Sequence, residues 1–284
     1  MVRTAFFFFA VPALALAQSV SFTPPRAPEV GLVVTESKLQ DMNMDMAVTL
    51  PNGQTMDLPT AEKSSSKVRY EVLEVAEDGA MTQLKVTVEE ESKSRAQGPQ
   101  QQSKTSPLSG ETFVLTKTEA GIEATTEAGE PLGPDKVEAA TRGHGKLLGK
   151  DPKALNKFHE ILEKDSYSVG DTIKVEGEKA RRLFDDSGKG EMKDVTLTLT
   201  LASVEEVDGR QVALFDATMV MQGSPEPGME LKSEMSGQIG IFVDGSETYS
   251  MNVSGPLSMS ANKDGMSMEG EGTMSLENKR TYSK

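Results

Sequence analysis

Apolar and polar residues alternate one by one along most of the chain, which is the period of a β-strand with two different faces. The clearest run holds Met42, Met44, Met46, Val48 and Leu50 at every second position, with mostly polar residues between them. The Pro-Asn-Gly sequence at 51–53 then predicts a turn. One apolar and one wet face is typical of an antiparallel sheet.

The same alternation returns in three later segments. It predicts a hairpin over 68–88 that turns at Asp78-Gly79, a second over 197–219 that turns at Asp208-Gly209, and a final strand over 266–276. We therefore expect a mainly β (α+β) protein built on a curved antiparallel sheet.

Two stretches break this pattern. Residues 92–107 contain no apolar side chain larger than Ala, which predicts a mobile loop. Residues 134–164 have helical spacing: a weaker helix is expected over 135–142, and a stronger one begins with Asp151 as N-cap and Pro152 at its first position. A short helical piece is also expected over 178–184. We expect one or two helices from 134–164 to cover the apolar face of the sheet.

The hairpins indicate an internal duplication. Gly79 turns the first hairpin and Gly209 the second, and a Ser-Gly strand start and a Gly turn follow each hairpin in the same order. We therefore predict a first β half over 30–133, a helical connector over 134–168 and a second β half over 169–284. Whether the halves share one sheet or form two domains is left open by the pattern.

The N-terminus has the pattern of a secretory signal. A positive start at Arg3 precedes an uncharged apolar run over 5–16 and a small-x-small cleavage site that ends at Ala17. We predict cleavage near Ala17, a flexible lead-in over 18–29 and export to a bacterial periplasm or the medium. The run is short for a membrane span, and no transmembrane segment is expected in the mature chain.

Charge and composition narrow the function. The formal net charge of −14 gives no electrostatic basis for binding nucleic acid. The absence of cysteine excludes disulfides, thiolate metal sites and cysteine nucleophiles. Neither His144 nor His159 has metal-ligand spacing, and we expect both at the surface or on a helix flank. No catalytic motif and no cofactor motif is present, so we expect a protein that is not an enzyme.

Methionine is the most informative residue type, with 16 in the chain. We consider three roles: core filling, a soft wall for an acyl chain or other apolar ligand, and binding of Cu(I) or Ag(I) through thioethers. No histidine accompanies the methionines, and residues two apart on a strand lie about 6.6–7 Å from each other, which is wide for a shared ion. The candidate apolar ligand-binding residues are Met42, Met44, Met46, Phe158, Phe215, Met219, Met221, Met266 and Met268.

Several of these motifs resemble a group of exported bacterial β-rich domains of unknown function. The resemblance lies in the leader, the two hairpins, the Ser-Gly strand starts and the segment from Tyr167 to Asp171. The expected architecture is also similar to that of LolA/LppX-type carriers, in which a curved antiparallel sheet encloses helices and a lipid cavity. This likeness implies a fold and does not fix a function.

We therefore expect an exported, non-enzymatic binding or scaffold protein whose methionine-rich face holds a lipid or another apolar small molecule. A periplasmic copper-binding protein and a purely structural envelope protein are the alternatives.

Overall fold

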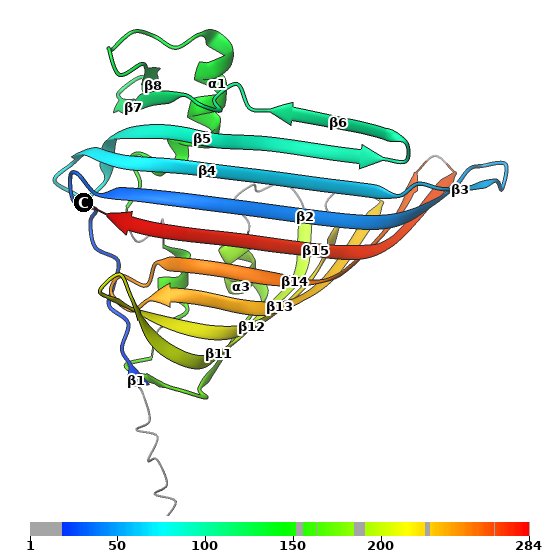
Figure 1. Ribbon diagram of the computed structural model, residues 1–284. Coiled ribbons are helices and arrows are strands. Elements are labelled where there is room, and N and C mark those ends of the chain that lie inside the picture. The colour runs from blue at the N-terminus through cyan, green and yellow to red at the C-terminus, as the bar shows by residue number, and fades with distance from the viewer. Residues whose placement is uncertain are drawn as a thin grey trace, which may run out of the picture.

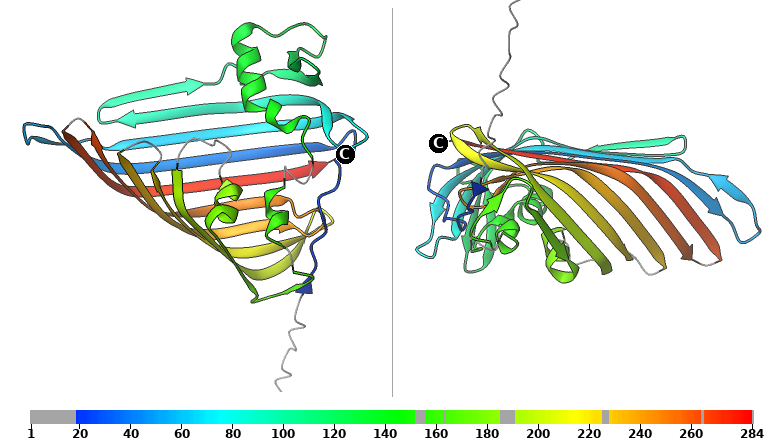
Figure 2. Two further views of the ribbon diagram at one scale, coloured as in Figure 1. Left: turned by 180° about the vertical axis from the view of Figure 1, so that it is seen from behind. Right: turned by 90° about the horizontal axis from the view of Figure 1, so that it is seen from below.

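The computed structural model describes residues 19–151, 156–162, 164–184, 191–224, 228–263 and 265–283. The predicted signal at 1–17 lies outside these residues. Within them, one large antiparallel sheet dominates the molecule, and a few short helices lie on one side of it (Figures 1 and 2). The chain is thus mainly β, as its alternating pattern predicts.

The sheet contains 13 strands of the described chain and runs without a break from one edge to the other. From one edge to the other, its strands are β10 (Thr172–Glu176), β11 (Glu191–Val207), β12 (Arg210–Ser224), β13 (Met229–Phe242), β14 (Thr248–Lys263), β15 (Met266–Ser283), β2 (Val33–Thr49), β4 (Thr60–Val75), β5 (Met81–Gln97), β7 (Thr112–Thr118) and β8 (Gly121–Thr125). Beside this path, β3 (Thr55–Asp57) pairs with β2, and β6 (Gln100–Thr105) pairs with β5. A separate ribbon joins β1 (Ser19–Val20) to β9 (Tyr167–Ser168).

The first and the last long strand of the chain, β2 and β15, pair with each other. β15 pairs with β2 along its whole length, from Ser267 opposite Thr49 to Ser283 opposite Val33. The predicted halves therefore share one continuous sheet. The run β4-β5-β7-β8 and the run β11-β12-β13-β14 follow the same sequential order, while their origin by duplication stays a prediction.

The expected strands and turns are confirmed. The alternating run forms the end of β2 up to Thr49, and β4–β5 and β11–β12 are the two expected hairpins. In the second hairpin, Asp208 and Gly209 both have positive φ, of 50° and 77°. Such a pair of left-handed residues makes the tight turn that joins two antiparallel strands.

Both hydrophobic cores lie against the same face of the sheet, here called the inner face. The larger core covers β10–β14 and includes Leu197, Phe215 and Ile239. The smaller core covers β4, β5 and β7 and includes Val86, Phe113 and Leu115. Directly opposed residues of neighbouring strands project to the same side, so the pairing register shows which other residues share this face. The strands bend toward the side that carries the helices (Figure 2).

Short helices cover the cores. Helix α1 (Pro134–Gly143), as expected, and the 3₁₀ turn η1 (Gly145–Leu147) contribute to the smaller core. The 3₁₀ turn η2 (Lys157–Glu160) and helix α3 (Gly177–Phe184) contribute to the larger core. Of the helix expected from Asp151, residues 152–155 lie outside the described residues, and residues 156–162 contain the 3₁₀ turn η2 in place of an α-helix.

The prediction of a mobile loop over 92–107 is wrong. Residues 92–97 complete β5, and β6 returns beside them from Gln97 opposite Gln100 to Ser92 opposite Thr105. Backbone hydrogen bonds form this hairpin without apolar side chains, and Gly98 supplies the positive φ of 55° at its turn, a geometry that glycine adopts without strain. The expected flexible lead-in over 18–29 is held in two places: β1 pairs with β9, and the backbone N–H of Thr23 donates to the Val243 carbonyl at 3.0 Å.

Candidate functional site

The methionines of the first and last long strands meet on the inner face. In the register of β15 and β2, Met42 lies opposite Met274, and Met268 lies opposite Val48. The next strands extend the row, because Met259 of β14 lies opposite Gly270 and Leu231 of β13 lies opposite Met259. We call this surface the methionine face; it consists of Met42, Met44, Met46, Val48, Leu231, Met259, Met266 and Met268.

The remaining candidate residues belong to the larger core. Phe215 is fully buried, Met219 and Met221 are 3% and 7% exposed, and Phe158 of η2 is 6% exposed. They pack among the leucines of β11 and the covering segments. Their surroundings correspond to core filling, so these four do not form one surface with the methionine face.

The methionine face itself is only partly covered. Met44 is 4% exposed, Met266 is 38% exposed, and Met42, Met46 and Met268 lie between these limits. None of these five belongs to either core. Among the described elements, α1 contacts β8 and η1, and α3 contacts β10, β11 and η2. Figure 2 shows the ends of β2, β14 and β15 extending beyond these helices.

Two glycines of β15, Gly270 and Gly272, lie close to the neighbouring strand β2. A Cβ atom added at Gly270 would lie 3.0 Å from Met44 Cε and 3.0 Å from Met46 Cγ. The two methionine side chains therefore lie across this glycine. The Thr60 hydroxyl donates to Met46 Sδ at 3.6 Å and fixes that side chain further.

A buried ionic cluster lies on the same face toward the other end of β2. The Arg280 guanidinium donates to Glu36 Oε1 at 2.8 Å, and Lys38 Nζ lies 2.6 Å from Glu36 Oε2. Glu36 is only 6% exposed. Burial favours its neutral form, but Arg280 and Lys38 outweigh that effect and hold the pKa of Glu36 below its ordinary value.

A histidine–tyrosine pair lies beside the smaller core. Tyr70 OH and His144 Nδ1 are 3.1 Å apart, and the two rings lie with centroids 5.8 Å apart. His144 is 6% exposed, so its expected surface position is wrong; α1 and η1 meet at this residue and carry it inward. Burial lowers the pKa of His144 and raises that of Tyr70, so both groups are held neutral.

A third polar cluster surrounds Arg210 at the start of β12. Its guanidinium pairs with Asp244 through bonds of 2.9 and 3.0 Å and lies 3.7 Å from the centroid of the Phe242 ring. The Tyr282 ring lies on it as well, at 4.9 Å. Burial raises the pKa of Glu247, the acceptor for Tyr282, although Arg210 opposes the shift. These contacts link the end of β15, at Tyr282, to the start of β12 and the end of β13.

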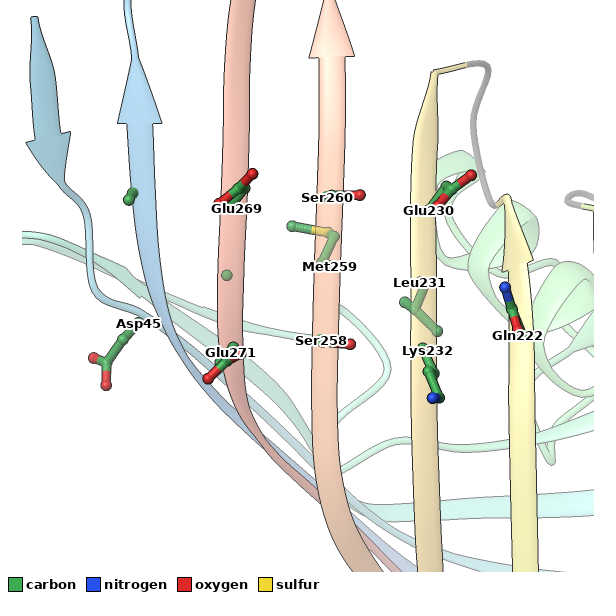
Figure 3. A pocket seen from close by; sticks show the side chains of 12 residues that line it. Asp45, Gln222, Glu230, Leu231, Lys232, Ser258, Met259, Ser260, Glu269 and Glu271 are labelled. Atoms are coloured by element: carbon green, nitrogen blue, oxygen red, sulfur yellow. The ribbon is translucent and has the colours of Figure 1, made fainter.

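Two hollows lie along the outer face. The larger, of about 600 Å³, crosses β12–β15 and β2; the outer-face residues Asp45, Glu230, Lys232, Ser258, Glu269 and Glu271 line it, and Leu231, Met259 and Gly270 of the same strands border it as well (Figure 3). The smaller, of about 420 Å³, lies farther along the same strands beside Asp41, Asn43 and Ser254. Acidic and small polar side chains thus form the outer surface directly behind the methionine face.

The described residues contain no group of three or more His, Cys, Asp or Glu side chains placed to hold a metal ion. They also contain no helix with both the length and the apolar character that crossing a membrane requires.

Comparison with known proteins gives no family. No family model matches the chain, and no curated protein matches it. Similar solved structures include lipovitellin, studied for its lipid–protein interactions, at 10% identity and a TM-score of 0.36, with 87% of this chain and 25% of that chain covered. This chain therefore spans about a quarter of the lipovitellin chain.

Two bacterial structures are also similar. An outer membrane channel from Pseudomonas putida F1 shares 10% identity over 90% of this chain and 97% of that one, with a TM-score of 0.21. An exported protein with a YmcC-like fold from Bacteroides fragilis shares 9% identity over 92% of this chain and 99% of that one, with a TM-score of 0.19. All three TM-scores are below 0.5, so none of these proteins defines the function of this chain.

Proposed function

We propose that this chain is an exported, non-enzymatic binding protein whose methionine face holds the acyl chain of a lipid or a similar apolar molecule. One observation carries the proposal. A contiguous row of apolar side chains, all but Met44 at least partly exposed, crosses β13, β14, β15 and β2 on the inner face, outside both cores and beyond the helices. Contiguous exposed apolar surface of this kind marks interaction sites.

Methionine suits such a surface because its side chain is flexible and polarisable and can repack around guests of different shape. An acyl chain of about 12 carbons on an open face would bury roughly half of its surface. At about 0.8 kcal/mol for each fully buried methylene, this contact contributes about 5 kcal/mol, which corresponds to a dissociation constant on the order of 0.1 mM. The expected binding is therefore weak and reversible.

The test uses a pair of neighbouring variants on opposite faces of β15. Met268→Lys places a charge on the methionine face, and Ser267→Lys places the same charge on the outer face one residue away. Isothermal titration with a 12-carbon lysophospholipid below its micelle concentration measures affinity. We expect Met268→Lys to weaken binding at least fivefold and Ser267→Lys to leave it unchanged. Equal affinity in both variants and the parent would contradict the proposal.

The soft-metal alternative is tested with the same proteins. Titration with Cu(I) against a competing chelator measures thioether binding, for which the described residues offer no accompanying histidine cluster. We expect affinity no tighter than micromolar. Tight Cu(I) binding that Met268→Lys abolishes would favour the metal function instead.

A further inference from the structure

The inner face changes chemical character at the boundary between β2 and β4. On the β2 side it carries methionines, whereas on the β4–β5–β6 side the register brings together polar and cationic residues. Met42 lies opposite Glu62, Glu62 lies opposite Arg95, and Arg95 lies opposite Gln102. The residues of one continuous surface thus pass from apolar to charged over three strands.

Three cations of β5 and β6 and one cation of β2 lie close together on the inner face. Lys93 lies opposite both Ser64 and Lys104, and Lys38 lies opposite Ser66. We call Lys38, Lys93, Arg95 and Lys104 the cationic strip. All four are exposed.

The carboxylates on this face offset the cationic strip only in part. Lys93 pairs with Glu62 at 2.6 Å, Lys38 shares the buried Glu36 with Arg280, and Glu91 lies on the same face opposite Ser66. Within the described part of the chain, Arg95 and Lys104 have no carboxylate within 4.0 Å. A locally positive surface is notable in a chain whose net charge is −14.

From this juxtaposition we propose that the occupant of the inner face is an anionic amphiphile, with its acyl chain on the methionine face and its phosphate or carboxylate headgroup on the cationic strip. The inference rests on the proposed function and adds the headgroup class to it. Neighbouring strands lie about 4.8 Å apart, so the step from β2 to β5 is about 10 Å, a distance that one lipid molecule can bridge.

The acyl chain and the headgroup of the ligand would each contact side chains of matching chemistry. Methionines provide the one-sided apolar contact for the acyl chain, while Arg95 offers a planar fork that can bind a phosphate or carboxylate through two hydrogen bonds. All six residues of β6 are exposed, so the headgroup would stay hydrated at the edge of the sheet. The acidic outer face repels an anion and favours the inner face.

The experiment compares two lysophospholipids with the same 12-carbon chain and different headgroups. Lysophosphatidylglycerol is anionic, and lysophosphatidylcholine is zwitterionic. Both are titrated at low salt into the full mature chain, into Arg95→Glu and into Lys63→Glu. Lys63 is the matched control because it lies one position from Glu62 on β4, opposite Ser94, and is exposed on the outer face.

We expect the parent to bind the anionic lipid about tenfold more tightly than the zwitterionic one. Arg95→Glu should weaken binding of the anionic lipid by about the same factor and leave the affinity for the zwitterionic lipid unchanged. Reversing one charge at about 6 Å in water has an effect of this size. Lys63→Glu should change neither affinity by more than twofold. Circular dichroism confirms that all three proteins are folded.

The outcomes separate the headgroup inference from the proposed function. Equal affinity for both lipids, or an Arg95→Glu effect no larger than that of Lys63→Glu, overturns the headgroup inference and leaves the acyl site standing. Failure of both lipids to bind overturns the two together. Displacement of the anionic lipid by inorganic phosphate, beyond the effect of sodium chloride at equal ionic strength, would indicate a free-anion site and would also overturn the inference.

Discussion

Removing the Arg280 side chain should show how much the buried Glu36–Arg280 ion pair between β2 and β15 contributes to the free energy of unfolding. Arg280→Met keeps most of the side-chain volume and leaves Glu36 with Lys38 as its remaining cation. The Arg280 guanidinium and the Glu36 carboxylate lie 2.7 Å apart. At that separation and an effective dielectric constant of about 20, the gross attraction is about 6 kcal/mol. Breaking a fully buried pair costs about 3–5 kcal/mol.

The expected loss is smaller than this because Arg280 keeps 34% of its side chain exposed, and solvent screens the pair. We expect Arg280→Met to lower the free energy of unfolding by about 2–3 kcal/mol. The control is Lys38→Met, because the Lys38 side chain is 52% exposed. Its removal should cost less than about 1 kcal/mol.

Urea unfolding at pH 7, followed by far-UV circular dichroism, measures these losses in the parent, both single variants, Glu36→Gln and the double variant Glu36→Gln/Arg280→Met. The pKa of Glu36 is lowered in the folded chain, so its stabilising contribution is complete above its ordinary pKa of 4.5 and is lost as pH falls through the folded-state value. The gap between the parent and Arg280→Met should therefore narrow below about pH 4. Equal losses in Arg280→Met and Lys38→Met, or a coupling energy near zero in the double-mutant cycle, would show that the Glu36–Arg280 pair does not stabilise the fold.

Three further predictions concern stability and are measured by the same urea assay. Phe215→Ala should cost about 3–5 kcal/mol, because this ring is fully buried in the larger core, and a loss below about 1 kcal/mol would contradict that packing. Gly272→Ala should destabilise the chain by more than about 1 kcal/mol, since its Cβ would overlap the Asn43 carbonyl oxygen, whereas Gly133→Ala, with open space around it, should cost far less. The pKa of His144 is lowered by burial, so the parent should lose stability relative to His144→Gln as pH falls from 7 toward 5; parallel pH profiles would show that His144 is not held neutral.

The strands are the part of the fold that the sequence predicts well. Alternation of Met42, Met44 and Met46 with polar residues follows directly from the two-residue period of a strand whose faces differ. Gly209 marks its turn because left-handed backbone geometry favours glycine. These signals are local, so they are visible in the sequence itself.

The end of β5 and β6 could not be predicted in this way. Both faces of this hairpin are polar, so alternation is absent and the composition matches that of a loop. The strand pairing arises from backbone hydrogen bonds to β4, which the side-chain pattern does not record. This error also concealed Arg95 and Lys104, which lie beside the methionine face only once the strands are paired.

Two Met-x-Met motifs with the same local spacing differ in burial, because the segments that cover one of them are distant in the sequence. Met219 and Met221 repeat the Met-x-Met spacing of Met44 and Met46, yet the first pair lies in the larger core and the second does not. The difference comes from η2, α3 and the segment around Phe22, which contribute to the larger core from distant parts of the sequence. The Glu36–Arg280 pair joins residues 244 positions apart and depends on the β15–β2 register, which no local pattern specifies.

The methionine face should bind an apolar chain, whereas the core methionines should not. Selective ¹³C labelling of the methionine methyl groups can distinguish the two sets, because each methionine gives one NMR signal and single Met→Leu variants assign them. On titration with the 12-carbon lysophospholipid, we predict that the signals of Met46, Met259 and Met268 shift while those of Met219 and Met235, both in the larger core, stay in place. Shifts confined to the core methionines, or no shifts at submillimolar lipid just below its micelle concentration, would contradict binding on the methionine face.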